Sequence, residues 1–295
     1  MAKENREIKS GVFADLFGDD EKDGKRNFLS LYNALHGTDL KLENTVIEAK
    51  KIPQAVIKTF YNDVSMLING KLIVLVEHQS TPNQNMPLRF LEYYVHLLYG
   101  IIPAKARYRE KLFKIPTPEF YVFYNGEKKA ERECIMKLSD AFHDFQSDPA
   151  CELKVKFENI RGKAGANLPV VRNCVIMKQY CDFMEIIFRY QAELNSQSTG
   201  EERQTCYERA IREAISKGIL VDYLTRKGTE VINMFSDEYD YDLDMEVKAE
   251  EAREEGIQQK AVEAAVFIVK KYKTPPEEAA KDMNAPLELV LNALQ

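Results

Sequence analysis

The spacing of apolar and polar residues predicts a chain that begins with helices and continues with strands. Residues 11–36 carry apolar side chains at helical spacing on both sides of an acidic, glycine-containing turn, which predicts two short helices. Residues 55–67 and 71–79 are predicted strands, and the continuous apolar run of the second is typical of a strand buried on both faces. Asn69 and Gly70 between them form a strong hairpin-turn signal.

The pattern then alternates between helix and strand. A helix is predicted from about Pro87 to Ile102, because proline is favoured in a first turn. The segment PEFYVFYNG is an aromatic-rich strand, and residues 151–160 alternate apolar and polar side chains as a half-buried strand does. Residues 168–230 are predicted to be mostly helical, with apolar side chains on one face.

The C-terminal part of the chain has a different character. Residues 236–256 hold ten acidic residues against Lys248 and Arg253, which indicates a linker or a solvated helix start. Residues 257–295 contain three short helical patterns and resemble a small module of the helix-turn-helix type. We therefore predict a domain over 1–235, an acidic linker over 236–256 and a helical module over 257–295.

Composition limits the class of protein. The 295 residues have a net charge of −6 and are 45% hydrophobic, which suits a globular protein. The start of the chain is polar, so we expect no signal peptide, and no apolar run approaches the roughly 20 residues that span a bilayer. The five cysteines follow no metal-binding or pairing pattern, which favours a reducing, cytoplasmic location.

Charge is unevenly distributed along the chain. Residues 41–130 hold 13 Lys and Arg against 8 Asp and Glu, although the whole chain is acidic. A locally positive region can meet phosphates, and the alternative is an ordinary solvated face.

The segment YNDVSMLINGKLIVLVEHQ carries the candidate chemistry. Asp63 lies on the first hairpin strand, Glu77 lies at the far end of the second, and Gln79 follows two residues later. Side chains alternate along a strand, so Glu77 and Gln79 share a face. Two converging carboxylates attract a hard cation such as Mg²⁺, which can polarise a phosphodiester and activate a water molecule.

Convergence of the two carboxylates depends on the hairpin register. A two-residue loop would place Asp63 opposite Val76, facing away from Glu77. A loop of three residues, or a β-bulge, would place both carboxylates on one face. We predict the bulged or three-residue hairpin; a regular two-residue hairpin with Asp63 and Glu77 on opposite faces would overturn the shared metal site.

Taken in order, these segments resemble the PD-(D/E)XK nuclease core and, more specifically, the Rpn family of recombination-promoting nucleases, also described as transposases. The matching segments cover almost the whole chain, and the EHQS…MPLR…Y block is the most specific of them. They are VFADLFGD, IVLVEHQSTPNQNMPLRFLEYYVHLLYG, IPTPEFYVFYNG, LSDAF, VKFENIRG and EAREEG.

The resemblance implies a restriction-endonuclease-like α/β fold, with a central mixed sheet flanked by helices and a C-terminal helical region. It also implies a cytoplasmic, bacterial DNA endonuclease that uses Mg²⁺, with Mn²⁺ or Ca²⁺ as alternatives, in recombination, transposition or defence. Asp63 and Glu77 match the metal-binding acids, and Gln79 stands where the wider superfamily usually has lysine. The family tends to carry an Asp just before the VF pair, where this chain has Lys9-Ser10-Gly11, and Asp15 is the substitute that we consider.

Five further residues are candidates for DNA contacts. Arg89 and Tyr93 lie four residues apart on the predicted helix, so they either reach a phosphate or pair with Glu92 and fill the core. Lys105, Arg107 and Arg109 either follow a DNA backbone or are solvated charges.

Two classes of function compete. The first is an active DNA endonuclease, and the second is a catalytically decayed nuclease fold that binds DNA or protein. The acidic net charge and the missing first-helix Asp favour the second mildly. RNA as the substrate and a homodimer as the assembly stay open.

Overall fold

In the computed structural model, a six-stranded mixed sheet forms the centre of the first of two compact units. The structure describes residues 11–50, 63–78, 82–126, 128–144, 147–195 and 197–294. The strand order is β1-β2-β3-β4-β6-β5. The strands are β1 (Ile47–Ala49), β2 (Asp63–Ile68), β3 (Lys71–His78), β4 (Thr117–Tyr124), β5 (Glu133–Lys137) and β6 (Lys154–Asn159).

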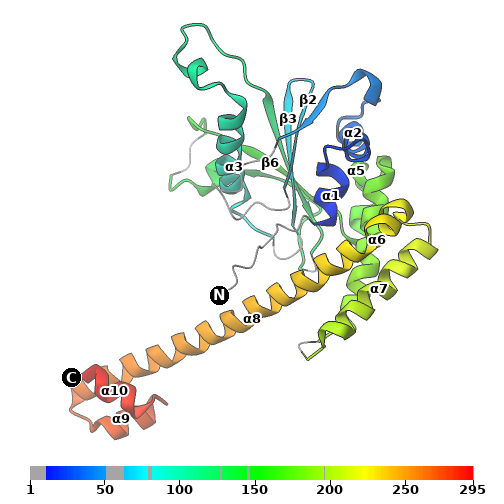
Figure 1. The fold of residues 1–295 in the computed structure, drawn as a ribbon. Helices are drawn as coiled ribbons and strands as arrows, with labels where there is room; N and C mark the ends of the chain where they lie inside the picture. Colours follow the sequence, from blue (N-terminus) through cyan, green and yellow to red (C-terminus); the bar gives the residue numbers. More distant parts are fainter. Residues whose placement is uncertain are drawn as a thin grey trace. The chain divides into compact units, whose positions relative to one another are not determined.

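Helices lie on both faces of this sheet (Figure 1). Those of the first part of the chain are α1 (Val12–Gly18), α2 (Lys22–His36), α3 (Met86–Ile101), α4 (Gly162–Ala166), α5 (Pro169–Asn173), α6 (Val175–Gln191) and α7 (Gly200–Ser216). They are followed by α8 (Val221–Tyr272), α9 (Pro276–Asp282) and α10 (Leu287–Leu294), and the short 3-10 helices are η1 (Leu42–Asn44), η2 (Ala104–Tyr108) and η3 (Leu138–Ala141). The predicted α/β class, with a mixed sheet flanked by helices, is confirmed.

The two faces of the sheet have separate cores. On one face α3 packs Phe90 and Leu97 against Val122 and Phe120 of β4. On the other face Phe13 of α1 contacts Phe123 of β4, with ring centroids 5.8 Å apart. The strands between these cores are therefore buried on both faces, as the apolar run of β3 predicts.

The β2–β3 hairpin corrects the predicted register. Ile68 pairs with Lys71, so the loop has only two residues, and Asn69 and Gly70 have φ angles of 47° and 76°. Positive φ at both positions is what a type I′ turn requires, and its twist matches that of the strands. The prediction of a three-residue or bulged hairpin is wrong, because Asp63 pairs with Val76.

Burial explains why this register is selected. Val64, Met66 and Ile68 are at most 2% exposed and share one face of β2. A shift of one residue would move all three to the opposite face, so the core holds the register that the turn prefers.

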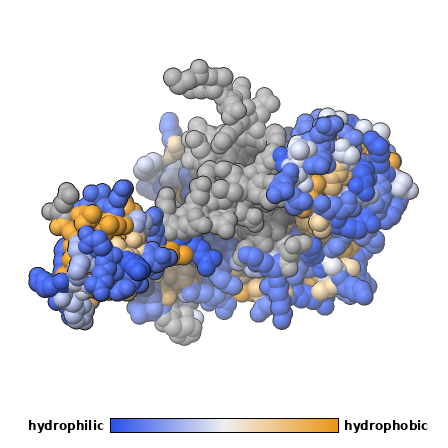
Figure 2. Space-filling view, turned by 90° about the horizontal axis from the view of Figure 1, so that it is seen from below, coloured by the Kyte–Doolittle hydropathy of each residue, from blue (hydrophilic) through white to orange (hydrophobic). Residues whose placement is uncertain are grey.

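The acidic stretch 236–256 is part of helix α8. Contact clustering divides the chain into units 1–234 and 235–295. The second unit has its own small core, in which Ala265 of α8 packs with Ala280 of α9 and Val290 of α10. Apolar residues also gather on the surface of this unit, at the left of Figure 2, and include Phe267 and Leu289.

All five cysteines are free thiols. Within the described part of the chain, no helix has both the length and the hydrophobicity that crossing a membrane requires.

The turn can be tested by adding a methyl group. Gly70→Ala forces an L side chain into the left-handed region and should lower the free energy of unfolding by about 1–2 kcal/mol. Gly100→Ala is the matched control, because Gly100 has no positive φ and an added Cβ meets nothing within 4 Å. Urea denaturation of both variants and the parent checks this. A Gly70→Ala variant as stable as the parent would contradict the assigned turn.

Candidate active site

Three parallel strands end together at one edge of the sheet. β3 pairs with β4, and β4 pairs with β6, so that His78, Tyr124 and Asn159 lie in one row at their carboxyl ends. In open α/β sheets, ligands bind outside the carboxyl ends of parallel strands. This edge is therefore the candidate position of a ligand site.

One residue before these ends, a row of acidic positions crosses a single face. Glu77 pairs with Phe123, Phe123 with Glu158, and Glu158 with Glu133. Paired residues share a face of a sheet, so Glu77 and Glu158 occupy positions on the same side and are separated by Phe123. This is the face that Phe13 of α1 covers.

Glu158 is half-buried and lacks a full set of partners. Its Oε2 atom is buried and accepts no hydrogen bond. Burial and then the charge of Glu133, opposed by Lys156, together raise the pKa of Glu158 to about 7. Near neutral pH this carboxyl can therefore hold or release a proton, which is a property of acid–base groups in active sites.

Asn125 brings a second unpartnered polar group to the same edge. It follows the last residue of β4, is only 2% exposed, and its Nδ2 donates no hydrogen bond. Its carbonyl oxygen accepts from Arg161, whose backbone N–H donates to Asn159 Oδ1. The loops after β4 and β6 are thus joined.

The predicted site residues are brought together only in part. Asp63 is the first residue of β2 and Glu77 the penultimate residue of β3, so both lie at the open end of the hairpin. The register nevertheless assigns positions 63 and 77 to opposite faces of the sheet. The side chains of Asp63 and Glu77 are not described, and Gln79 lies outside the described residues.

Asp15 has a structural partner. Its Oδ2 accepts hydrogen bonds from Lys227 Nζ at 3.1 Å and from the Tyr223 hydroxyl at 3.3 Å, both on α8. Burial and the nearby Asp15 carboxylate raise the pKa of Tyr223. These contacts join α1 to the start of α8, so Asp15 is already engaged in a half-buried ion pair.

The candidate DNA-contact residues fall into two groups. Tyr93 is 4% exposed and lies in the core on the α3 side, where its hydroxyl is 3.4 Å from Ser65 Oγ, so it takes the core-filling alternative. Arg89 is half-buried one turn earlier. In contrast, Lys105, Arg107 and Arg109 are all exposed, in and after η2.

A second titratable cluster lies at the opposite edge of the sheet. Glu119 accepts hydrogen bonds from Lys71 at 2.6 Å and from the Tyr121 hydroxyl at 2.9 Å, and it lies 2.7 Å from His36 Nε2. Burial raises the pKa of Glu119, but the hydrogen bonds outweigh it, so the pKa is lowered. Because its oxygens are already satisfied by partners within the chain, this cluster attaches α2 to the sheet and is not a candidate for catalysis.

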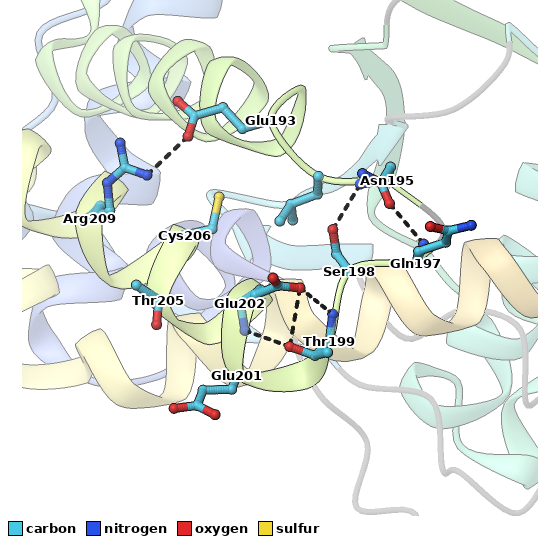
Figure 3. A pocket seen from close by; sticks show the side chains of 11 residues that line it. Glu193, Asn195, Gln197, Ser198, Thr199, Glu201, Glu202, Thr205, Cys206 and Arg209 are labelled. Carbon is cyan, nitrogen blue, oxygen red and sulfur yellow. Dashed lines mark hydrogen bonds and ion pairs between the residues drawn. The ribbon is translucent and has the colours of Figure 1, made fainter.

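An open pocket of about 800 Å³ lies elsewhere, between the end of α6 and the start of α7. In Figure 3 several of its polar groups are paired with one another: Thr199 and Glu202 form a capping box, and Arg209 binds Glu193 at 3.0 Å. These groups are used in holding the two helices, which leaves the pocket without a reactive set.

No group of three or more His, Cys, Asp or Glu residues with metal-binding geometry occurs among the described residues. Sequence patterns missed Glu158 and Asn125, and the signal that could have found Glu158 is an acid at the end of an otherwise alternating strand.

Glu158 gives a test of the site's electrostatics. Its pKa in the folded chain is above the ordinary value of 4.5, so its stabilising contribution is present below pH 4.5 and is lost as the pH rises through 7. Glu158→Gln should remove this loss, making the variant more stable than the parent at pH 8 by about 1–3 kcal/mol and nearly equal at pH 4. Urea denaturation at both pH values measures it, with exposed Glu131→Gln as control; a constant difference between the two pH values would contradict the buried carboxyl.

Comparisons of the chain with protein-family models, with curated proteins and with solved structures find no match. The functional assignment therefore depends on the residues and the geometry described above.

Proposed function

We propose that this chain is a metal-dependent nuclease of the PD-(D/E)XK type, with Glu77 as its central metal-binding carboxylate. One observation carries the proposal: Glu77 is the penultimate residue of a central strand, at the carboxyl edge of three parallel strands. A carboxylate in such a strand is costly unless it is paired or binds a cation. The order of Asp63, hairpin, Glu77 and helix α3 agrees with the resemblance to this superfamily.

The residues divide the chemistry in the following way. Glu77 would hold Mg²⁺, which would supply Lewis-acid polarisation of the phosphodiester and a more acidic water molecule. The register does not assign Asp63 to the same face. Gln79 would orient that water by a hydrogen bond, because an amide cannot supply the charge of lysine. Glu158, on the same face as Glu77, is suited to giving a proton to the departing oxygen.

The fit of a metal to these residues is uneven. The position of Glu77 and the unpartnered oxygen of Glu158 suit a cation at this face. Position 63 is on the other face by register, so Asp63 can join the same ion only from the end of β2, where it is the first residue. Asp63 is for that reason the weaker member of the pair.

The same register favours a second candidate function. If the two acids stay on opposite faces, the fold cannot assemble a two-carboxylate metal site, and the chain would bind nucleic acid or a protein partner without cutting it. A cleavage assay separates the two functions.

Glu77→Gln should reduce Mg²⁺-dependent nicking of supercoiled plasmid by a factor of about 100 or more, because the metal loses its main anionic ligand. Asp63→Asn should reduce it as well, and more weakly if Asp63 acts from the strand end. Agarose gels with purified full-length protein, with and without EDTA, measure both effects.

Exposed Glu131→Gln is the matched control and should nick at the parental rate. Nicking that survives Glu77→Gln would refute the proposed centre. A parental protein that does not nick plasmid with Mg²⁺, Mn²⁺ or Ca²⁺, but shifts DNA in a gel-shift assay, would favour the second candidate function, binding without cleavage.

A further inference from the structure

The segment between α3 and β4, residues 103–116, forms an arm. Figure 1 shows it extending away from the sheet and helices beyond the end of α3. Every residue from 103 to 115 is exposed except Ala106, and η2 is its only regular element. An exposed arm of this length has no core of its own to stabilise, so its composition reflects contact with solvent or with a ligand.

The arm is strongly basic in an acidic chain. It holds five basic residues and one acid, Glu110. The basic residues are Lys105, Arg107, Arg109, Lys111 and Lys114. Two such arms from two copies of the chain would repel each other, and a phosphate backbone would be attracted.

Large apolar side chains are interleaved with these charges. Tyr108 is 89% exposed, Leu112 is 79% exposed, and Phe113 is 38% exposed. Tyr99, on the last turn of α3, is 60% exposed. A surface that served only to repel or to stay soluble would not expose so much apolar area on one short segment.

Arg107 is already stacked on an aromatic ring. Its guanidinium carbon lies 4.3 Å from the centre of the Tyr99 ring. This arrangement holds a flat cation beside exposed rings, which is the combination that proteins use to stack unpaired bases and contact their phosphates. Bases inside a duplex are stacked on their neighbours and offer no free face to Tyr108.

We propose that this arm binds a single-stranded segment of nucleic acid, with Tyr108 as a base-stacking platform and with Lys105, Arg107 and Arg109 on the phosphates. The inference rests on the proposed function only in taking nucleic acid as the ligand, and it specifies that the preferred strand is unpaired. It does not require cleavage.

The arm and the acidic row lie at opposite ends of the parallel strands. The base of the arm is attached to the hairpin turn, where Thr117 N–H donates to the Gly70 carbonyl at 3.0 Å. Glu77 follows Lys71 by six residue steps along β3, which is about 20 Å in an extended strand. The arm's side chains therefore lie apart from the acidic row, and their binding can be measured in EDTA with no cleavage.

The chain contains no tryptophan, so Tyr108→Trp places the only tryptophan of the variant at the platform. Titrating the full-length variant with an oligothymidylate of about 20 nucleotides in EDTA should quench this fluorescence, and a blunt duplex of equal length should not. Tyr108→Ala should weaken oligothymidylate binding by roughly 5- to 100-fold and leave duplex binding unchanged. Phe142→Ala, an exposed aromatic outside the arm, is the matched control and should change neither affinity.

Several outcomes would overturn the inference. Equal affinity for single strand and duplex would do so, as would a Tyr108→Ala variant with parental oligothymidylate binding. A parental dimer in light scattering that Tyr108→Ala dissociates, with no change in oligonucleotide affinity, would identify the partner as a second copy of the chain instead. If oligothymidylate quenches the Tyr108→Trp variant but the parental protein never nicks plasmid, the proposed nuclease is rejected and this inference is kept. If the parent nicks plasmid but does not prefer single strands, this inference is rejected and the nuclease is kept.

Discussion

The backbone pairing of Ile68 with Lys71 across a two-residue turn is the constraint on which the rest of the sheet depends. Asn69 and Gly70 both accept the left-handed conformation, and this allows the strands to leave the turn with the twist of a normal sheet. The pairing decides which residues of β2 and β3 face α1 and which face α3. It assigns Asp63, Ser65 and Glu77 to their faces of the sheet. It therefore also separates Asp63 from Glu77, the two acids of the candidate metal site.

Parallel pairing then carries this register to the chemistry. β4 and β6 continue from β3 in the same direction, so an acid at the end of β3 and another at the end of β6 arrive at one level of one face. The carboxyl of Glu158 is poorly solvated there, and Glu133 in the next strand disfavours its charge. Glu158, which can carry a proton, therefore lies on the same face as the proposed metal ligand Glu77. The two residues are 81 positions apart in the sequence, and in the sheet only Phe123 lies between them.

Local patterns were sufficient to predict much of the fold, and long-range pairing was not. The helices α1, α2 and α3, the β2–β3 hairpin, and the strands β4 and β6 are all set by apolar periodicity and by turn residues near them in sequence. β1 and β5 were missed, because three or five residues at the sides of a sheet carry little periodicity. The register prediction failed for a different reason: it placed Asp63 and Glu77 on one face, whereas the turn preference of Asn-Gly and the burial of β2 place them on opposite faces. Glu158 was missed because its burial depends on Phe123 and Glu133, which only the folded sheet places beside it.

Electrostatics connects the two ends of the sheet. A chain with net charge −6 repels a polyanion at long range, so its positive charge has to be concentrated where contact is made. The arm at residues 103–116 concentrates positive charge through its Lys and Arg side chains. At the carboxyl edge, a bound cation would supply positive charge to Glu77 and its acidic neighbours. Under the proposed function, binding through the arm would need no metal, whereas a phosphodiester would approach the acidic row only after a cation had neutralised it. This difference gives binding and cleavage separate requirements within one domain, and it explains how the fold could keep the first while losing the second.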